Sequence, residues 1–412
     1  MISHCVIGGG IAGCFTAMQL LKRNKHFVLL EQSKKPHSKV ESVKIKEGEL
    51  LEMGASIFHT NQTHLLSLME DVGLKQNIIP LGEKLDIFIP SSISHKLALP
   101  SSDEISKRFQ ELRARLQQAA CLQPATSSLT MEELSRQIFE HDEFVFLQTY
   151  WAAWFENNQM NARGFFKAEM REGTYCKLKG GLKSIIQACW DRCKDQLHTD
   201  CQVISVKQVQ VHHEMLFRVR YLEGGLTIRQ LFCKHLHMCV SLEQLNSIVY
   251  VNHNMDASML QYQTYATSLS SMRFFVLLKQ PVRDLSRSIV SDHLCKWILQ
   301  LSPTVWMVYV DGELADRLHT LSDEAIVEDC LTVLNKACHV HLTREDVHRT
   351  IRAYWKHAFE VLNPHYFSDP RTRNIDLRLV PFHCTSLPTP EGQAWMEGHL
   401  YLDKGKGTLD KG

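Results

Sequence analysis

Hydrophobic and polar positions predict a strand, a helix and a second strand within the first 31 residues. Ile2–Ile7 is a short apolar run with β-branched residues, which is typical of a buried strand. Apolar positions from Ile11 to Leu21 then recur at helical spacing. Residues 26–30 form a second short apolar run that ends at Glu31. The pattern therefore predicts a βαβ unit at the N-terminus.

The same periodicities predict a mixture of helices and strands along the rest of the chain. Helical spacing appears within 65–72, 104–120, 131–140 and 323–337, and after the Lys179–Leu182 turn. Alternation predicts strands over 202–211, 272–278, 304–310 and 349–359, with further antiparallel strands up to residue 240. No apolar run approaches the about 20 residues that span a bilayer. We expect an α/β protein.

Three glycines between the first strand and the helix have G-x-G-x-x-G spacing. Gly8 permits a tight turn, Gly10 lets a pyrophosphate approach the backbone, and Gly13 lets the helix pack closely on the strand. The helix N-terminus offers unpaired N–H groups and a positive dipole end to phosphates. Glu31, at the end of the second strand, would accept hydrogen bonds from ribose hydroxyls. The alternative is a glycine-rich turn that binds nothing, but the flanking strand, helix and acid favour a dinucleotide site.

The motif alone does not show whether the dinucleotide is NAD or FAD. The sequence blocks that follow favour FAD, because they resemble a family of flavoproteins. VIGGGIAG, LLEQ, ELLEMGASIFH and LLSLMEDVGL together resemble the flavin-containing amine oxidase superfamily, with polyamine and prenylcysteine oxidases nearest. The resemblance implies FAD as cofactor. The residues it implies as FAD-binding in this half of the chain are Gly8, Gly10, Ile11, Ala12, Gly13, Glu31, Gln32, Lys39, Gly54, Ala55 and Ser56.

Two later blocks extend the resemblance to residues 177–210 and 381–402. A Gly-Gly turn, a helix and a strand would return the chain to the FAD domain, and Val203 would meet the adenine. PTPEGQAWMEGHLYL is similar to the family's closing flavin motif. It implies a helix over 393–402 whose N-terminus faces the flavin, with Met396 and Glu397 at the motif positions.

Two family features are different in this chain. His37-Ser38-Lys39 stands where the family usually has Gly-Gly-Arg; Lys39 keeps the positive charge but not the bidentate fork. The family's lysine near the flavin is not recognisable, since Arg273 and Lys279 are both poor matches, so no catalytic base is assigned. These differences motivate an alternative, a binding or escort protein that resembles GDP-dissociation inhibitors. A third interpretation, an NAD-dependent dehydrogenase, is disfavoured by the blocks around Gly54 and Glu397.

The matched blocks predict two interleaved domains. A Rossmann-like FAD-binding domain with a mixed sheet would contain residues 1–79, 177–245 and 360–412. An α+β substrate domain would contain residues 80–176 and 246–359. Trp151 and Trp154 lie in an aromatic-rich stretch that could line a substrate cavity or be an ordinary aromatic core. His59 lies in the matched block and is a second candidate substrate contact.

Composition narrows the class of protein without naming its chemistry. The chain has 412 residues, of which 44% are hydrophobic and 22% charged, so it can bury a large core. A formal net charge of +1 leaves no basic field to hold a nucleic acid. The 13 cysteines, without an export signal, are expected to be reduced thiols in a cytoplasmic protein.

Histidines are numerous, at 22, and two groups could suggest a metal site. His235, His237 and Cys239 alternate along a predicted strand, and Cys338, His339 and His341 lie close together. We interpret them as solvent-facing residues, because neither has zinc-motif spacing; no metal is expected. The expected function is transfer of a hydride from a small amine or thioether to FAD, with oxygen as the electron acceptor.

Overall fold

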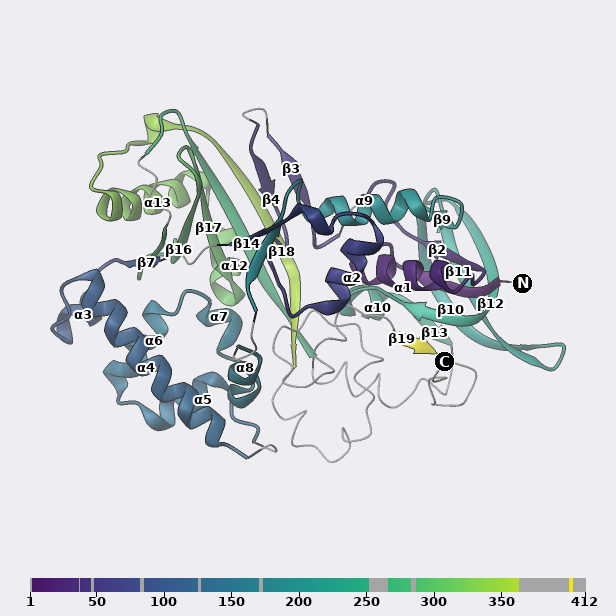
Figure 1. The fold of residues 1–412 in the computed structure, drawn as a ribbon, viewed down its shortest axis with the longest axis horizontal. Helices are drawn as coiled ribbons and strands as arrows, with labels where there is room; N and C mark the ends of the chain where they lie inside the picture. The colour runs from purple at the N-terminus through teal and green to yellow at the C-terminus, as the bar shows by residue number, and fades with distance from the viewer. Residues whose placement is uncertain are drawn as a thin grey trace. The chain divides into compact units, whose positions relative to one another are not determined.

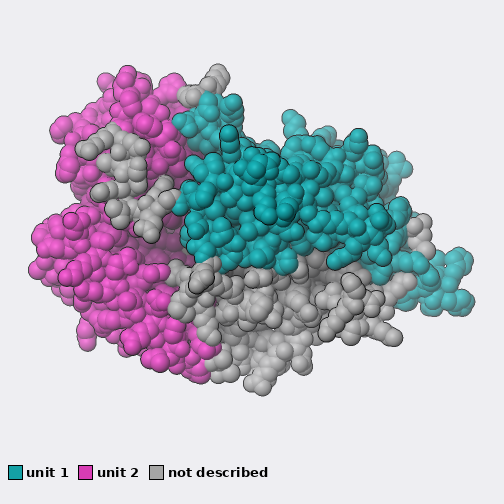
Figure 2. Space-filling model, viewed as in Figure 1, with its two compact units in different colours: residues 1–81, 171–266, 370–412 teal, residues 82–170, 267–369 magenta. Residues whose placement is uncertain are grey.

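The chain forms two compact units, each assembled from separate stretches (Figure 1). The computed structural model describes residues 2–36, 38–45, 48–81, 85–124, 127–169, 173–251, 266–282, 287–362 and 400–402. Figure 2 shows the first unit (1–81, 171–266 and 370–412) and the second unit (82–170 and 267–369) in different colours. That the first unit is the FAD-binding domain and the second the substrate domain stays a prediction.

The first unit is built on a mixed sheet in the order β13-β10-β11-β12-β1-β2-β9, with β19 beside β12. The strands of this sheet are β1 (Ile2–Ile7), β2 (Phe27–Leu30), β9 (Leu197–His198), β10 (Cys201–Val211), β11 (Glu214–Glu223), β12 (Thr227–Met238), β13 (Val249–Val251) and β19 (Leu400–Leu402). Its helices are α1 (Ile11–Lys22), α2 (Thr63–Asp71), α9 (Lys183–Arg192) and α10 (Leu242–Ser247). β1 is parallel to β2 and β12, and α1 connects β1 to β2. The predicted βαβ unit is confirmed.

Alternation along β1 divides the first unit into two cores. Val6 faces a cluster that includes side chains of α1, α2 and α9. Cys5 and Ile7 point to the opposite face, where they meet Val203 and other side chains of β10 to β12. β1 therefore lies between two apolar layers, one of which includes α1, and this packing fixes the position of the glycine loop at the end of β1.

Short strands beside the main sheet complete the first unit. β3 (Ser42–Lys44) and β4 (Leu50–Glu52) form a two-stranded hairpin. β5 (Phe58–His59) and β6 (Ile78–Pro80) both pair with β8 (Tyr175–Leu178), and a 3-10 turn, η1 (Lys75–Asn77), precedes β6. The β5–β8 and β6–β8 pairs join residues about 100 positions apart in sequence.

The C-terminal segment differs from its predicted helix. Only residues 400–402 of the segment 393–402 are described, and they form strand β19. The helix prediction is wrong for these three residues because an open strand edge is available to them. β11 pairs with β12 only as far as Cys233, and beyond that point Leu236–Met238 pair with β19 in antiparallel fashion.

The second unit combines a sheet with two groups of helices. Its strands follow the order β18-β14-β17-β16-β15-β7. They are β7 (Leu85–Phe88), β14 (Ala266–Leu278), β15 (Arg287–Val290), β16 (Trp297–Ser302), β17 (Val305–Asp311) and β18 (Val347–Leu362). The helices are α3 (Ser92–Lys96), α4 (Ser102–Leu122), α5 (Met131–Ile138), α6 (His141–Tyr150), α7 (Trp154–Asn157), α8 (Ala162–Glu169), α12 (Gly312–His319) and α13 (Asp323–Cys338), with a 3-10 turn η2 (Arg344–Asp346).

The two helix groups of the second unit cover different faces of its sheet. One core joins the sheet to α12 and α13, and another joins it to α3–α8. The predicted helices at 104–120, 131–140 and 323–337 and the predicted strands at 272–278, 304–310 and 349–359 are confirmed. Within the described ranges, no helix has the length and apolar character needed to cross a bilayer.

Candidate functional site

The glycine loop between β1 and α1 is fixed by contacts that only glycine allows. Gly8 has a φ of +99°, and a Cβ atom there would lie 2.3 Å from the Cys239 carbonyl oxygen. A Cβ atom on Gly13 would lie 1.8 Å from the carbonyl oxygen of Gly8. The first turn of α1 therefore packs directly on the end of β1, as the spacing of the motif predicts.

The N-terminus of α1 offers backbone donors without a protein acceptor. Gly10 is the N-cap, no side chain caps the helix, and its first turn contains no acid. Among the described residues, the N–H groups of Gly10, Ile11, Ala12 and Gly13 have no hydrogen-bond acceptor. A Cβ atom on Gly10 would meet only Ser38, at 3.6 Å. This arrangement fits a pyrophosphate, which brings acceptors and negative charge to free N–H groups and to the positive end of the helix.

Glu31 is buried at the end of β2 and points at the glycine loop. Its Oε2 atom accepts a hydrogen bond from the Gly9 N–H at 2.6 Å, and its Oε1 atom accepts one from the Ser33 N–H at 2.7 Å. Each carboxylate oxygen keeps a second lone pair for a ribose hydroxyl. The negative charge beside the loop disfavours a nucleotide with a 2′-phosphate. The acid therefore also fits the adenosine end of FAD.

Trp190 of α9 is a contact of the loop that sequence reasoning missed. Its Nε1–H donates a hydrogen bond to the Gly9 carbonyl at 2.9 Å, and its side chain is 5% exposed. The signal available in the sequence was weak, because the apolar spacing of α9 marks Trp190 only as a core residue. The contact joins residues 181 positions apart.

Two thiols beside the loop have pKa values that burial raises. Cys14 donates from Sγ to the Gly9 carbonyl at 3.5 Å. Burial, together with the neighbouring Cys189 thiol, raises the pKa of Cys14 well above its ordinary value. Burial raises the pKa of Cys239 to about 12. Both side chains are therefore neutral thiols at physiological pH and poor nucleophiles.

The segments around Lys39 and Gly54 lie side by side. The Lys39 carbonyl accepts a hydrogen bond from Ala55 N–H at 2.8 Å, and a Cβ atom on Gly54 would lie 2.0 Å from that carbonyl oxygen. Gly54 is buried, Ala55 is exposed and Ser56 is half-buried. The structure thus brings together Lys39 and the Gly-Ala-Ser segment, two blocks that the family resemblance assigns to the cofactor.

The Gly-Gly turn before α9 is attached to the β3–β4 hairpin. A Cβ atom on Gly181 would lie 2.4 Å from Ser42 Oγ. Glu52 accepts hydrogen bonds from the Leu182 N–H at 2.9 Å and from Ser42 Oγ at 2.5 Å. Lys183 forms an ion pair with Glu41 at 2.5 Å. Glu52 therefore satisfies a free donor at the N-terminus of α9, a role that its sequence position did not reveal.

The remaining predicted cofactor residues have different surroundings. The start of β10 lies beside Glu31, because Cys201 N–H donates to the Glu31 carbonyl at 2.9 Å. Val203 is buried in the core beneath the sheet. Gln32 is exposed. His37, Met396 and Glu397 lie outside the described residues, and their assignment stays a prediction.

His59 is held at the end of β5 by local contacts. Its Nδ1 atom accepts a hydrogen bond from Asn61 N–H at 3.3 Å, and its ring meets Tyr175 edge to face, with centroids 4.9 Å apart. A Cβ atom on Gly173 would lie 2.2 Å from the His59 ring. Tyr175 is exposed. A substrate contact by His59 stays a prediction.

Trp151 and Trp154 lie in the core of the α3–α8 group. They are 6% and 0% exposed, and their ring centroids are 6.2 Å apart. Arg113 lies over the Trp151 ring at 5.8 Å. An aromatic core accounts for this packing, and a substrate-lining role stays a prediction. Of the two cations considered near the flavin, Arg273 is buried beside the Tyr309 ring and Lys279 is exposed.

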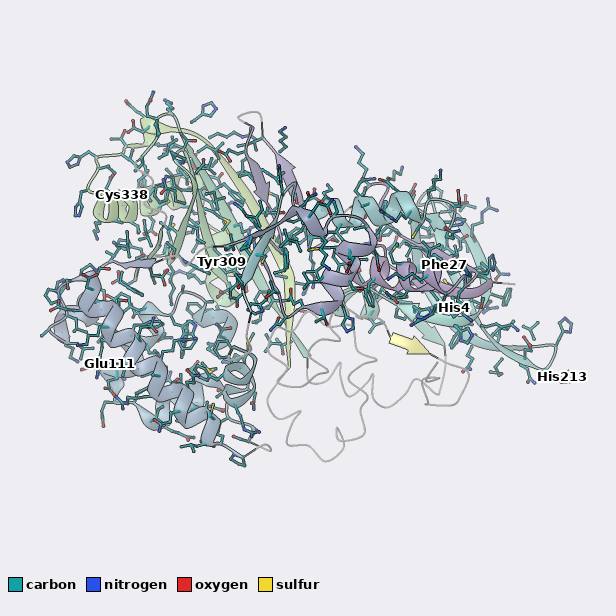
Figure 3. All side chains as sticks on the ribbon, in the orientation of Figure 1. His4, Phe27, Glu111, His213, Tyr309 and Cys338 are labelled. Atoms are coloured by element: carbon teal, nitrogen blue, oxygen red, sulfur yellow. The ribbon has the colours of Figure 1, made fainter. Side chains whose placement is uncertain are left out.

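The histidines of β12 differ from their predicted environment. His237 is 5% exposed, and its Nε2 atom lies 3.1 Å from His4 Nδ1. His235 stacks on His4 with ring centroids 4.5 Å apart. A solvent-facing role is wrong for His237 and also for Cys239, which is 8% exposed and lies at the glycine loop. At His237, β12 pairs with β1 on one side and with β19 on the other, and the His237 ring lies against His4 of β1. Figure 3 labels His4 and Phe27, which are register partners on β1 and β2. No group of three potential ligands with metal-site geometry occurs among the described side chains.

Comparison with protein-family models gives one match. The model described as flavin containing amine oxidoreductase matches residues 11–380. No curated protein sequence matches the chain significantly.

Comparison with solved structures finds amine oxidases of the same fold. Putrescine oxidase bound to putrescine has a TM-score of 0.70 and 15% identity, covering 96% of this chain and 97% of that chain. Cyclohexylamine oxidase from Brevibacterium oxydans IH-35A has a TM-score of 0.70 and 14% identity, covering 96% of both chains. A putrescine oxidase variant with redesigned cofactor binding has a TM-score of 0.73 and 14% identity, covering 96% of both chains.

Proposed function

The chain belongs to the flavin-containing amine oxidoreductases, and from this premise we propose that it oxidises a small amine or thioether and passes the electrons from FAD to oxygen. The protein is an FAD-dependent oxidoreductase; the substrate class and the electron acceptor are the proposed part. The observation that carries the proposed FAD site is the set of free N–H groups at the start of α1 beside the buried carboxylate of Glu31.

The roles proposed for the residues follow from this geometry. FAD, when bound, supplies the hydride acceptor. The N–H groups of Gly10, Ile11 and Ala12 would bind the pyrophosphate, and Glu31 would accept hydrogen bonds from the ribose. Lys39, in the segment beside Gly54, would add a positive charge near the diphosphate. The chain as a whole would not need a basic surface to bind it.

Small amines are the first substrate class to test. The structural neighbours are named for putrescine and cyclohexylamine oxidation, and putrescine is bound in one of them. Because these neighbours are at most 15% identical to the chain, they support the class of substrate and not an individual compound. Thioethers follow from the resemblance to prenylcysteine oxidases.

The test is a visible spectrum followed by a turnover assay. We expect the purified protein to show flavin absorption, to be bleached anaerobically by an active amine or thioether, and to produce hydrogen peroxide when oxygen returns. If no panel compound bleaches the flavin, the proposed substrate classes are wrong. If neither the purified protein nor the protein with added FAD shows bound flavin, the proposed cofactor site is wrong. Bound flavin without any turnover would favour the escort-protein alternative.

Gly10→Ala is a matched test of the proposed pyrophosphate position. The added methyl group meets only Ser38 at an ordinary contact distance of 3.6 Å, and the φ of Gly10, −71°, suits alanine. The apoprotein should therefore fold as the wild type does. The methyl group would nevertheless occupy the approach to the free N–H groups, so we expect FAD affinity to fall at least tenfold in a titration of the apoprotein. Unchanged affinity would place the pyrophosphate elsewhere.

A further inference from the structure

Both backbone polar groups of Gly9, in the glycine loop, form hydrogen bonds with side chains. Its N–H donates to Glu31 at 2.6 Å, and its carbonyl accepts from Trp190 Nε1 at 2.9 Å. A Cβ atom at Gly9 would lie 3.1 Å from both the Glu31 and the Trp190 side chains. These two side chains therefore lie side by side against Gly9. One follows β2 and the other belongs to α9.

The direction of the Gly9 carbonyl determines the direction of the next N–H group. A trans peptide unit is planar, and its C=O and N–H bonds point in opposite directions. The Gly9 carbonyl and the Gly10 N–H belong to one such unit, and all described peptide bonds are trans. With the carbonyl turned toward Trp190, the Gly10 N–H points away from α9. This N–H has no acceptor among the described residues.

We propose that Trp190 is a positioning residue for FAD, which aims the Gly10 N–H at the pyrophosphate by holding the Gly9 carbonyl. The inference deepens the proposed cofactor site and rests on it. Preorganised donors bind a ligand more tightly because the loop does not have to be ordered during binding.

Trp190 is well suited to this role because its own position is rigid. The side chain is buried, and its neighbours Ile186 and Cys189 belong to the same core as α1. Glu52 holds the other end of α9 through the Leu182 N–H. The second donor to Gly9, the Cys14 thiol at 3.5 Å, is intrinsically weak and cannot replace the indole.

Trp190→Phe removes the donor and keeps an aromatic ring in the core. We expect its apoprotein to bind FAD about five- to tenfold more weakly, which is the usual size of one hydrogen bond. Trp306→Phe is the matched control. Trp306 is fully buried in β17 of the second unit, and its Nε1 has no hydrogen-bond partner among the described residues. Its FAD affinity should stay within about twofold of the wild type, since only packing changes.

Two further measurements separate positioning from packing. Replacing Trp190 by benzothienylalanine, in which sulfur takes the place of the indole N–H, keeps the shape and should reproduce the loss of FAD affinity even if Trp190→Phe folds poorly. Amide hydrogen exchange of the peptide around Gly10 should be faster in both Trp190 variants than in the wild-type apoprotein. A purely structural role would lower the melting temperature without changing FAD affinity or this exchange.

The outcomes also distinguish the inference from the proposed function. If the wild-type apoprotein does not bind FAD, the cofactor site and the inference both fail. If the wild type binds FAD and the benzothienylalanine variant binds it equally tightly, only the role of Trp190 is overturned. Weaker FAD binding by the Trp190 variants, together with unchanged FAD binding by Trp306→Phe, supports the role of Trp190.

Discussion

Lys296 is a buried cation in the second unit, in the turn between β15 and β16. It is 6% exposed, donates to the Gln148 carbonyl at 2.6 Å and lies 5.3 Å from the centre of the Phe155 ring. Gln148 is in the last turn of α6, so the ammonium group also lies at the negative end of a helix. Burial is nevertheless the largest effect and lowers the pKa of Lys296 to about 8, with Asp311 acting in the opposite direction.

This lowered pKa predicts a pH-dependent contribution to stability. Between about pH 8 and the ordinary lysine value of about 10.4, the unfolded chain holds a proton that the folded chain has released. The contribution of Lys296 to the free energy of unfolding should therefore rise with pH across this window, by about 3 kcal/mol. Urea denaturation from pH 7.5 to 10.5 should show this rise as a difference between the wild type and Lys296→Met. Lys107→Met, at an exposed position of α4, is the control and should follow the wild-type curve.

At the residue scale, sequence predicted the contacts that a local motif specifies. Gly8, Gly13 and Glu31 lie as their spacing indicates, because a strand, a tight turn and a helix determine their positions within about 25 residues. Trp190 was not predictable in the same way, since its partner Gly9 is distant in sequence. The burial of His237 was also missed, because alternation along a strand does not show which neighbour covers it.

Glu52 connects two elements of the first unit, the β3–β4 hairpin and α9. Replacing it by alanine removes the acceptor for the Leu182 N–H and for Ser42 Oγ. We expect Glu52→Ala to lower the free energy of unfolding by about 1–2 kcal/mol, the usual cost of losing a helix N-terminal acceptor. Because α9 carries Trp190, FAD affinity should fall as well.

The control for Glu52→Ala comes from the same hairpin. Glu49 is half-buried, and its side chain makes no hydrogen bond among the described residues, so Glu49→Ala should change the free energy of unfolding by less than about 0.5 kcal/mol. Chemical denaturation of both apoproteins measures the difference. Equal losses would show that the hairpin tolerates neither change and that the Leu182 contact is not the cause.

At the element scale, the sequence predicted elements with a strong period and missed those defined by their partners. α4, α13, β10 and β18 have clear helical or alternating patterns. β3, β5 and β19 have two or three residues each, so they are strands only because another strand pairs with them. Such pairings depend on tertiary contacts that a local pattern does not contain.

Bound FAD should stabilise the molecule by mass action. At a free FAD concentration of 100 times its Kd, the folded cofactor unit gains about 2.7 kcal/mol relative to the apoprotein. Calorimetry should show the melting temperature rising with FAD concentration. Hydrogen exchange should assign the added protection to peptides of the first unit, such as those from β1, α1 and β2. Protection confined to the second unit would contradict the proposed assignment of the cofactor.

The resemblance of three separate blocks to one family predicted two interleaved domains, and the chain divides into two units that are each assembled from separate stretches. The boundaries of the two units were harder to predict from the sequence, because composition does not change at residues 81 or 171. The position of each boundary depends on which core the segment packs into. The segment 363–399 lies outside the described residues, so the predicted flavin contacts of Met396 and Glu397 stay predictions.

The parallel pairing of β1 with β12 has a consequence for synthesis on the ribosome. About 220 residues lie between the end of β1 and the start of β12. At roughly 5–20 residues per second, β1 emerges about 10–45 s before the strand that covers its edge. During that interval the nascent chain exposes an apolar strand edge that can pair with other chains. Folding yield in the cell should therefore depend on translation rate and on chaperones that bind the nascent N-terminal segment.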